Sequence, residues 1–139
     1  MTNSSSRVAE NADAIIVSSY SRADAIEDGV LVDVSVTARE MGFTIPVALT
    51  AAAWSECMSW NQAPSEQQQD ERGRLWDVLW MLRMAIRRSR VAGAGDRIDY
   101  HVSCVRARDG QRVLVPLVGV CGPGDEAEPV ITIMCPDED

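Results

Sequence analysis

Apolar residues recur every three or four positions between residues 66 and 90, and this spacing predicts one long amphipathic helix. The stripe that we expect to be buried consists of Leu75, Val78, Leu79, Leu82 and Ile86. Acidic residues lie near the start of the segment and arginines near its end, which is the favourable order for the helix dipole. A long helix that covers a core is therefore the first expected element.

A second helix, of about 14 residues, is expected from Pro46 onward, because proline suits the first turn of a helix. Apolar residues then follow at helical steps: Val47, Leu49, Ala53, Trp54, Cys57, Met58 and Trp60. The polar residues 61–65 break this pattern before the long helix begins. The middle of the chain is thus predicted to be helical.

The pattern changes to a period of two after the glycine-rich residues 92–96. In residues 97–104 Ile98, Tyr100, Val102 and Cys104 alternate with polar residues, which predicts a half-buried strand. Residues 113–121 and 130–135 supply two further strands, and residues 109–110, Asp-Gly, predict a tight hairpin between the first two. A three-stranded antiparallel meander is the expected result.

The register of this hairpin decides whether two cysteines can pair. With residues 109–110 as the loop, Cys104 lies opposite Val115, and Cys121 lies opposite Ile98. The two cysteines are then not neighbours across the strands, so a disulfide between them is not expected. No Cys-x-x-Cys spacing is present either, and reduced, buried thiols are predicted.

The N-terminal part is predicted to contain a mobile tail and short elements. Residues 1–11 are polar and lack an apolar period, while residues 14–17 and 30–34 have the composition of strands. Ser21 is the expected N-cap of a short helix through Glu27, and Ser35 or Thr37 is the expected cap of another that ends at Gly42.

Together these elements predict an α+β fold in a single domain, residues 12–139. Two central helices, one of them long, would pack on the C-terminal three-stranded meander, and the short N-terminal helices and strands would join it. No apolar run approaches the roughly 20 residues of a membrane span, and the polar N-terminus lacks the apolar region of a signal peptide. We therefore expect a cytoplasmic protein.

The chain is poor in groups that work as acids, bases or nucleophiles near neutral pH, since it has one histidine, four cysteines and no lysine. His101 falls on the polar face of a predicted strand, and residues 122–126, Gly-Pro-Gly-Asp-Glu, lack the Lys-Ser/Thr ending of a phosphate loop. No catalytic residue, metal site or cofactor is predicted. A metal-dependent enzyme that uses carboxylates gathered by the fold remains the alternative.

The net charge of −8 is concentrated at the two ends of the chain. Residues 1–40 carry 3 arginines against 7 acids, residues 41–96 carry 6 against 6, and residues 97–139 carry 4 against 8. Acidic surfaces repel nucleic acids and membranes and favour a protein partner with a basic surface. The predicted partner-binding residues are Asp24, Glu27, Asp28, Asp33, Asp125, Glu126 and Glu128.

Four tryptophans, at positions 54, 60, 76 and 80, all fall on the two predicted central helices. Two helices of this size cannot easily bury four indoles, so at least one is expected on a contact surface. A plasmid-maintenance or structural module that acts as a homodimer is therefore a further alternative. Arginines 83, 87, 88 and 90 are accompanied by six acids in the same segment, so direct nucleic-acid binding is not expected.

Several motifs resemble a family of small, uncharacterised bacterial proteins carried by plasmids and phages. They are IEDGVLVDV at residues 26–34, PVALT at residues 46–50, RLWDVLWM at residues 74–81 and GPGD..EPVITIM at residues 122–134. The resemblance spans about residues 14–135 and implies accessory cargo of mobile elements, in which small acidic proteins often inhibit host defence.

Charge, composition and resemblance together predict a non-enzymatic inhibitor of host defence, most concretely an anti-CRISPR protein. Its acidic residues would dock on a basic surface of a Cas complex, and exposed apolar or tryptophan side chains would add affinity.

Overall fold

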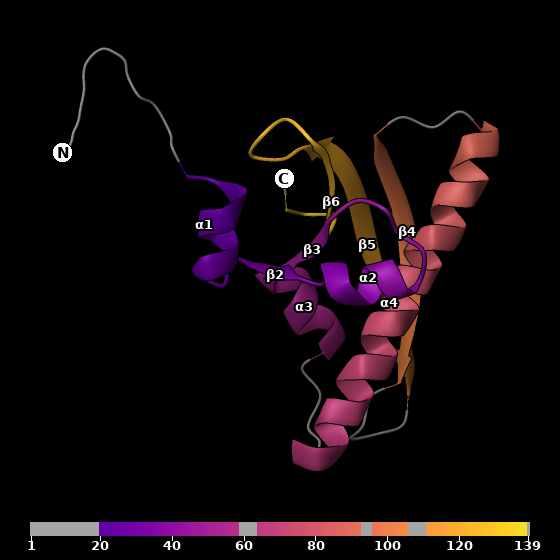
Figure 1. The fold of residues 1–139 in the computed structure, drawn as a ribbon. Helices are drawn as coiled ribbons and strands as arrows, with labels where there is room; N and C mark the ends of the chain where they lie inside the picture. The colour runs from indigo at the N-terminus through magenta and orange to yellow at the C-terminus, as the bar shows by residue number, and fades with distance from the viewer. Residues whose placement is uncertain (1–19, 59–63, 93–95, 106–110, 139) are drawn as a thin grey trace.

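One sheet with helices packed against it forms the frame of the protein (Figure 1). The computed structural model describes residues 20–58, 64–92, 96–105 and 111–138, and within these ranges the sheet has five strands. The strands are β2 (Leu31–Asp33), β3 (Val47–Thr50), β4 (Arg97–Val105), β5 (Arg112–Pro123) and β6 (Pro129–Met134). The helices are α1 (Arg22–Glu27), α2 (Ser35–Glu40), α3 (Ala51–Met58) and α4 (Pro64–Ala92). The α+β class predicted from the sequence is confirmed.

The strand order is β2-β3-β6-β5-β4, and the sheet is mixed. β3 runs parallel to β6, with Val47 opposite Ile131, whereas the other described pairs are antiparallel. The prediction of a three-stranded antiparallel sheet is therefore wrong in size and type. Strands β4, β5 and β6 follow one another as expected, but β3 and β2 extend the sheet beyond β6.

The two faces of the sheet differ in what covers them. On β4, Tyr100, Val102 and Cys104 are buried, while Asp99 and His101, on either side of Tyr100, are exposed, as the alternating pattern predicted. The hydroxyl of Tyr100 donates a hydrogen bond of 3.2 Å to the carbonyl of a residue in α4, which shows that α4 lies on the face with the buried residues. The opposite face of β4 is open to solvent.

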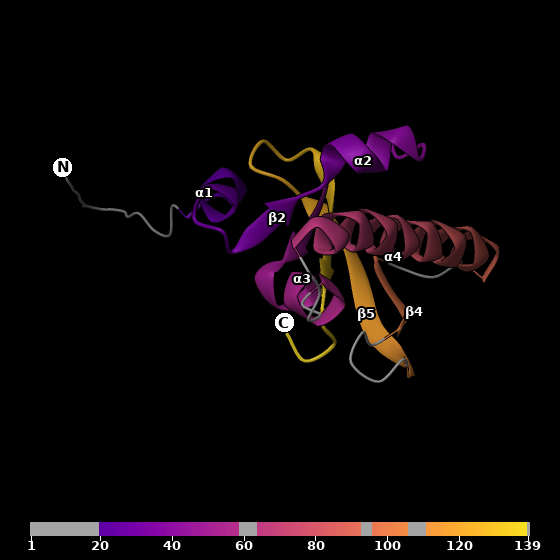
Figure 2. The same ribbon diagram turned by 90° about the horizontal axis from the view of Figure 1, so that it is seen from below.

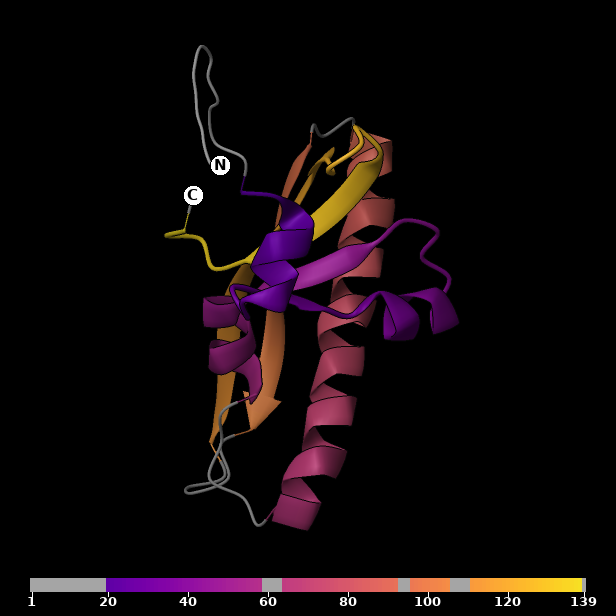
Figure 3. The same ribbon diagram turned by 60° about the vertical axis from the view of Figure 1, so that its left-hand side comes forward.

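Helix α4 provides the longest cover for the sheet, and it lies between α2 and α3 (Figures 2 and 3). Its buried residues include Leu75, Val78, Leu79 and Leu82, which agrees with the predicted stripe, whereas Ile86 is only half-buried. A side chain at Gly119 of β5 would place its Cβ 2.7 Å from Leu82 Cδ1. Glycine at this position therefore allows the helix to approach the sheet closely.

The region predicted as one central helix is divided between a strand and a short helix. Residues 47–50 form β3, and only residues 51–58 form α3. Val47, Ala48 and Leu49 are fully buried because the strand is covered on both faces and paired on both edges. The hydroxyl of Thr50 accepts a hydrogen bond of 3.1 Å from the amide of Ala53, so the first turn of α3 is capped after the strand ends.

The predicted short helices at the N-terminus are present. Ser21 is the N-cap of α1 and forms a capping box with Asp24, and Gly29 beyond the helix has a φ of 81°. The N-cap of α2 is Val34 rather than Ser35 or Thr37. Val34 provides no side-chain cap for α2. Instead, the carboxylate of Asp33 accepts a hydrogen bond of 3.1 Å from the amide of Ser35 in the first turn of the helix.

The β4–β5 register differs from the predicted one by two residues. Cys104 lies opposite Val113 and Ile98 lies opposite Gly119, and Val105 opposite Arg112 is the last pair among the described residues. A shift by two keeps every side chain on its predicted face, because the side-chain period of a strand is two.

The predicted turn at residues 109–110, the strand at 14–17 and the mobile tail at 1–11 lie outside the described residues. None of the described helices is long and apolar enough to cross a membrane.

Candidate functional site

The acidic residues predicted to bind a partner lie on one part of the surface, around α1. We refer to the seven residues Asp24, Glu27, Asp28, Asp33, Asp125, Glu126 and Glu128 as the α1 acidic surface, and all seven are exposed. The two sequence segments meet where the carboxylate of Asp125 accepts hydrogen bonds of 2.7 Å and 3.1 Å from the amides of Arg22 and Ala23. The turn between β5 and β6 is thereby joined to the first turn of α1.

Arg22 fixes this surface to the sheet. Its guanidinium donates hydrogen bonds of 2.7 Å to the hydroxyl of Thr132 and 2.9 Å to the carbonyl of Ile131, both on β6. Burial lowers the pKa of Arg22, and the nearby carboxylates of Asp33, Asp125 and Glu128 act in the opposite direction. The arginine stays protonated at neutral pH and partly offsets the negative charge around it.

Several acidic residues in this surface also have structural contacts. Asp24 belongs to the capping box of α1, and Asp28 accepts a hydrogen bond of 3.0 Å from the hydroxyl of Tyr20. Glu128 accepts one of 2.9 Å from the amide of Glu126. Toward the other described residues, the carboxylates of Glu27 and Glu126 form no hydrogen bond or ion pair. These two can therefore be changed without removing a contact that holds the fold.

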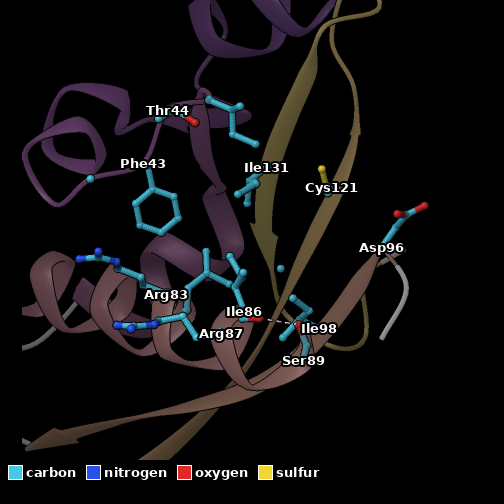
Figure 4. A pocket seen from close by; sticks show the side chains of 14 residues that line it. Phe43, Thr44, Arg83, Ile86, Arg87, Ser89, Asp96, Ile98, Cys121 and Ile131 are labelled. Atoms are coloured by element: carbon cyan, nitrogen blue, oxygen red, sulfur yellow. Dashed lines mark hydrogen bonds between the residues drawn. The ribbon is translucent and has the colours of Figure 1, made fainter. Parts of the chain in front are cut away.

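A cavity that the sequence did not predict lies between α4 and the sheet (Figure 4). It has a volume of about 650 Å³ and extends from the segment before β3 to the start of β4. Phe43, Ile86, Ile98 and Ile131 provide apolar walls, and Gly119 of β5 also lines the space. We refer to this space as the α4 cavity.

The two ends of the α4 cavity carry different charges. Arg83 and Arg87, one turn apart on α4, lie together beside Phe43, whereas Asp96 and Cys121 lie at the other side (Figure 4). Arg83 donates a hydrogen bond of 2.8 Å to the carbonyl of Met41 at the end of α2. The cavity thus combines an apolar interior with a cationic end, one of whose cations is held in place.

The outer face of α4 carries two exposed indoles. Trp76 is 42% exposed and Trp80 is 43% exposed, and they lie one turn apart. The guanidinium of Arg83 lies over the ring of Trp80, 6.0 Å from its centroid. Large aromatic side chains at this exposure are typical of contact surfaces.

Three of the four thiols are unsuited to act as nucleophiles. Cys57, Cys104 and Cys135 are buried, and burial raises the pKa of Cys57 to about 12 and that of Cys135 to about 11. Such thiols are protonated at neutral pH and are poor nucleophiles. Cys121 is exposed, so the prediction of burial is wrong for this residue. It lies at the end of the apolar run of β5 and lines the cavity.

Metal-ligating side chains are not grouped in the described ranges, where no set of three histidine, cysteine, aspartate or glutamate residues could hold an ion. His101 is exposed and lies opposite Pro116 in the β4–β5 register. The metal-dependent enzyme that the sequence left open therefore gains no supporting observation.

A family model matches residues 8–139, which is nearly the whole chain. The chain belongs to the family of unknown function DUF6573. No curated protein and no solved structure matches it. Membership agrees with the resemblance to an uncharacterised family and brings no assigned activity, so a function has to be argued from the surfaces and the cavity.

The α4 cavity had one signal in the sequence that points to it. Gly119 interrupts an otherwise apolar strand, and an isolated glycine in a strand indicates that another element approaches closely. Which arginines would line such a space could not be read from the pattern, because Pro46 was predicted to begin a helix, whereas residues 43–45 lead through it into strand β3. The cavity depends on that segment.

Proposed function

We propose that the protein is a non-enzymatic binding protein and that the α1 acidic surface contacts a partner with a basic surface. The observation that carries this proposal is the joining of two acidic segments by Asp125, whose carboxylate bonds the amides of Arg22 and Ala23. Residues about a hundred positions apart thus contribute to one exposed surface.

The charge of this surface supports recognition by electrostatics. The surface holds seven carboxylates and one guanidinium, that of Arg22, which leaves an excess of six negative charges. Such a surface accelerates encounter with a positively charged partner, and the effect weakens as salt screens it. The same field disfavours nucleic acid and anionic membranes as ligands.

More specifically, we propose that the protein inhibits host defence and that it acts as an anti-CRISPR protein. CRISPR effectors hold their guide and target strands in positively charged channels, so their surfaces have the complementary sign. An acidic protein that occupies such a surface would compete with nucleic acid. The resemblance to proteins of mobile elements motivates this choice of partner.

Neutralising Glu27 and Glu126 tests the acidic surface. The double variant Glu27→Gln/Glu126→Gln is expected to weaken partner binding by about tenfold at low salt, because it removes two charges without removing a described contact. The matched control is Glu40→Gln/Glu56→Gln, which changes the same charge at exposed positions on α2 and α3. Binding to a partner captured from a host lysate is measured in both variants, together with phage plating in cells with an active CRISPR system.

The comparison of the two pairs decides the outcome. An equal loss in both double variants would assign the effect to net charge, and full activity in the Glu27/Glu126 variant would remove the α1 acidic surface from the proposal. Inhibition of plating tests the anti-CRISPR role separately, since a protein can bind a basic partner in another process.

A homodimer through α4 is the second candidate, favoured by the exposure of Trp76 and Trp80. Light scattering of the unmodified chain, with a mass of 15.2 kDa per copy, is expected to give twice that mass. The variant Trp76→Ser/Trp80→Ser is expected to be monomeric, because aromatic residues dominate the energy of most interfaces. Val30→Ser/Val36→Ser, which changes two exposed apolar residues elsewhere, is the control, and a monomeric unmodified chain would refute the dimer.

A further inference from the structure

The α4 cavity has the size and lining of a small-molecule site. Its volume of about 650 Å³ lies within the range of roughly 300–1,000 Å³ that is usual for ligand pockets. Ile86, Ile98 and Ile131 come from α4, β4 and β6, so three separate elements shape one apolar space. An apolar interior of this kind favours a ligand with an apolar body.

The cationic end supplies the polar part of the recognition. Arg83 and Arg87 lie side by side next to Phe43, and neither forms an ion pair with a described residue (Figure 4). Arg83 is already oriented by its bond to the carbonyl of Met41. Two like charges one turn apart on a helix repel each other, and an anion between them would relieve that repulsion. Guanidinium groups bind carboxylates with well-defined geometry.

The remaining polar groups restrict the class of ligand. The hydroxyl of Ser89 donates a hydrogen bond of 2.8 Å to the carbonyl of Ile86, so it is engaged within α4. Asp96 at the far side would repel a second negative group. Besides the hydroxyl of Thr44, few side-chain groups are left to bond the polar edges of a nucleotide base, and a ligand with one anionic end fits better than one with two.

We infer that the α4 cavity binds a small amphipathic monoanion, a carboxylate with an apolar chain, whose carboxylate lies between Arg83 and Arg87. The chain would extend along Ile86 and Ile131 toward Cys121. This site is separate from the α1 acidic surface, so its occupation does not depend on the proposed function.

Octanoate is the probe, and acetate, octylamine and AMP are the comparison compounds. Isothermal titration calorimetry of the full chain is expected to show binding of octanoate at least tenfold tighter than that of each comparison compound. Acetate lacks the apolar chain, octylamine carries the opposite charge, and AMP adds a nucleoside and a second negative charge. Equal or tighter binding by any of them, or no binding of octanoate, would overturn the inference.

Two arginine variants locate the carboxylate. Arg87→Gln is expected to weaken octanoate binding at least fivefold, since it removes one of the two cations at the cavity end. Arg88→Gln is the matched control, because Arg88 is the next residue on α4, is exposed and does not line the cavity. Circular dichroism checks that both variants are folded. An equal loss of octanoate affinity in both variants would show that the overall positive charge of α4, and not Arg87 at the cavity, determines binding.

Cys121 provides a second readout that does not depend on heat of binding. As an exposed thiol at the cavity, it is expected to react with a disulfide reagent such as DTNB, and octanoate is expected to slow this reaction at least threefold. Cys121→Ser confirms which thiol reacts, since the other three are buried. An unchanged rate at saturating octanoate would place the ligand elsewhere and overturn the assignment.

Discussion

Replacement of Leu117 by alanine is expected to lower the free energy of unfolding by about 2–5 kcal/mol, the range typical of leucine truncation in a core. Leu117 is 1% exposed and lies opposite Tyr100 on the face of β5 that is covered by the helices. Its removal leaves a space that the packed helix and sheet can fill only in part. Urea denaturation followed by tryptophan fluorescence measures the change.

Leu114 on the same strand is the matched control. It is 66% exposed and lies on the other face of β5, so Leu114→Ala is expected to change the free energy of unfolding by less than about 0.5 kcal/mol. The two variants remove the same atoms from one strand. Similar losses in both would contradict the assignment of Leu117 to the covered face of β5 and of Leu114 to an exposed position on its other face.

Alkaline pH is expected to destabilise the protein strongly, beginning near pH 9. Burial raises the pKa of the Cys57 thiol from its ordinary value of 9.0 to about 12, so the unfolded chain loses this proton at lower pH than the folded chain does. The stabilisation is complete below pH 9 and is lost as the pH rises toward 12. At pH 11 the difference amounts to about 3 kcal/mol for Cys57 alone.

The other buried groups act in the same direction. Burial raises the pKa of Cys104, Cys135 and Tyr100, so each of them also favours unfolding at high pH. The chain has no lysine, whose titration would otherwise dominate the region around pH 10. Urea denaturation at pH 7, 9, 10 and 11 measures the loss. Cys57→Ala is expected to have a shallower pH dependence, and an unchanged slope in this variant would exclude Cys57 as a cause.

The fold could be predicted where one pattern dominates a segment. The periods of α4 and β4 are unambiguous, and the Ser21 capping box and Gly29 define the bounds of α1. The segment 47–50 was assigned to a helix because a short apolar run that is buried on both faces has no period of its own. Only its pairing with β2 and β6 makes it a strand, and that pairing joins distant parts of the chain.

The candidate surfaces could be predicted in part for a similar reason. The excess of acidic over basic residues at the two ends of the chain indicated the α1 acidic surface, and the number of tryptophans on two helices indicated exposed indoles. The bond from Asp125 to α1 and the cavity end at Arg83 arise from contacts across the fold, which composition and spacing do not encode. Sequence therefore provided the residue types, and tertiary structure provided their grouping.

The parallel pair at the middle of the sheet has a consequence for biosynthesis. Val47 pairs with Ile131, so β3 leaves the ribosome long before the strand that it pairs with has been translated. Until then, the edge of β3 and the apolar side of α4 are without their final neighbours, a condition that exposes a nascent chain to aggregation. The five-stranded sheet can be completed only after residues 129–134 have left the ribosome.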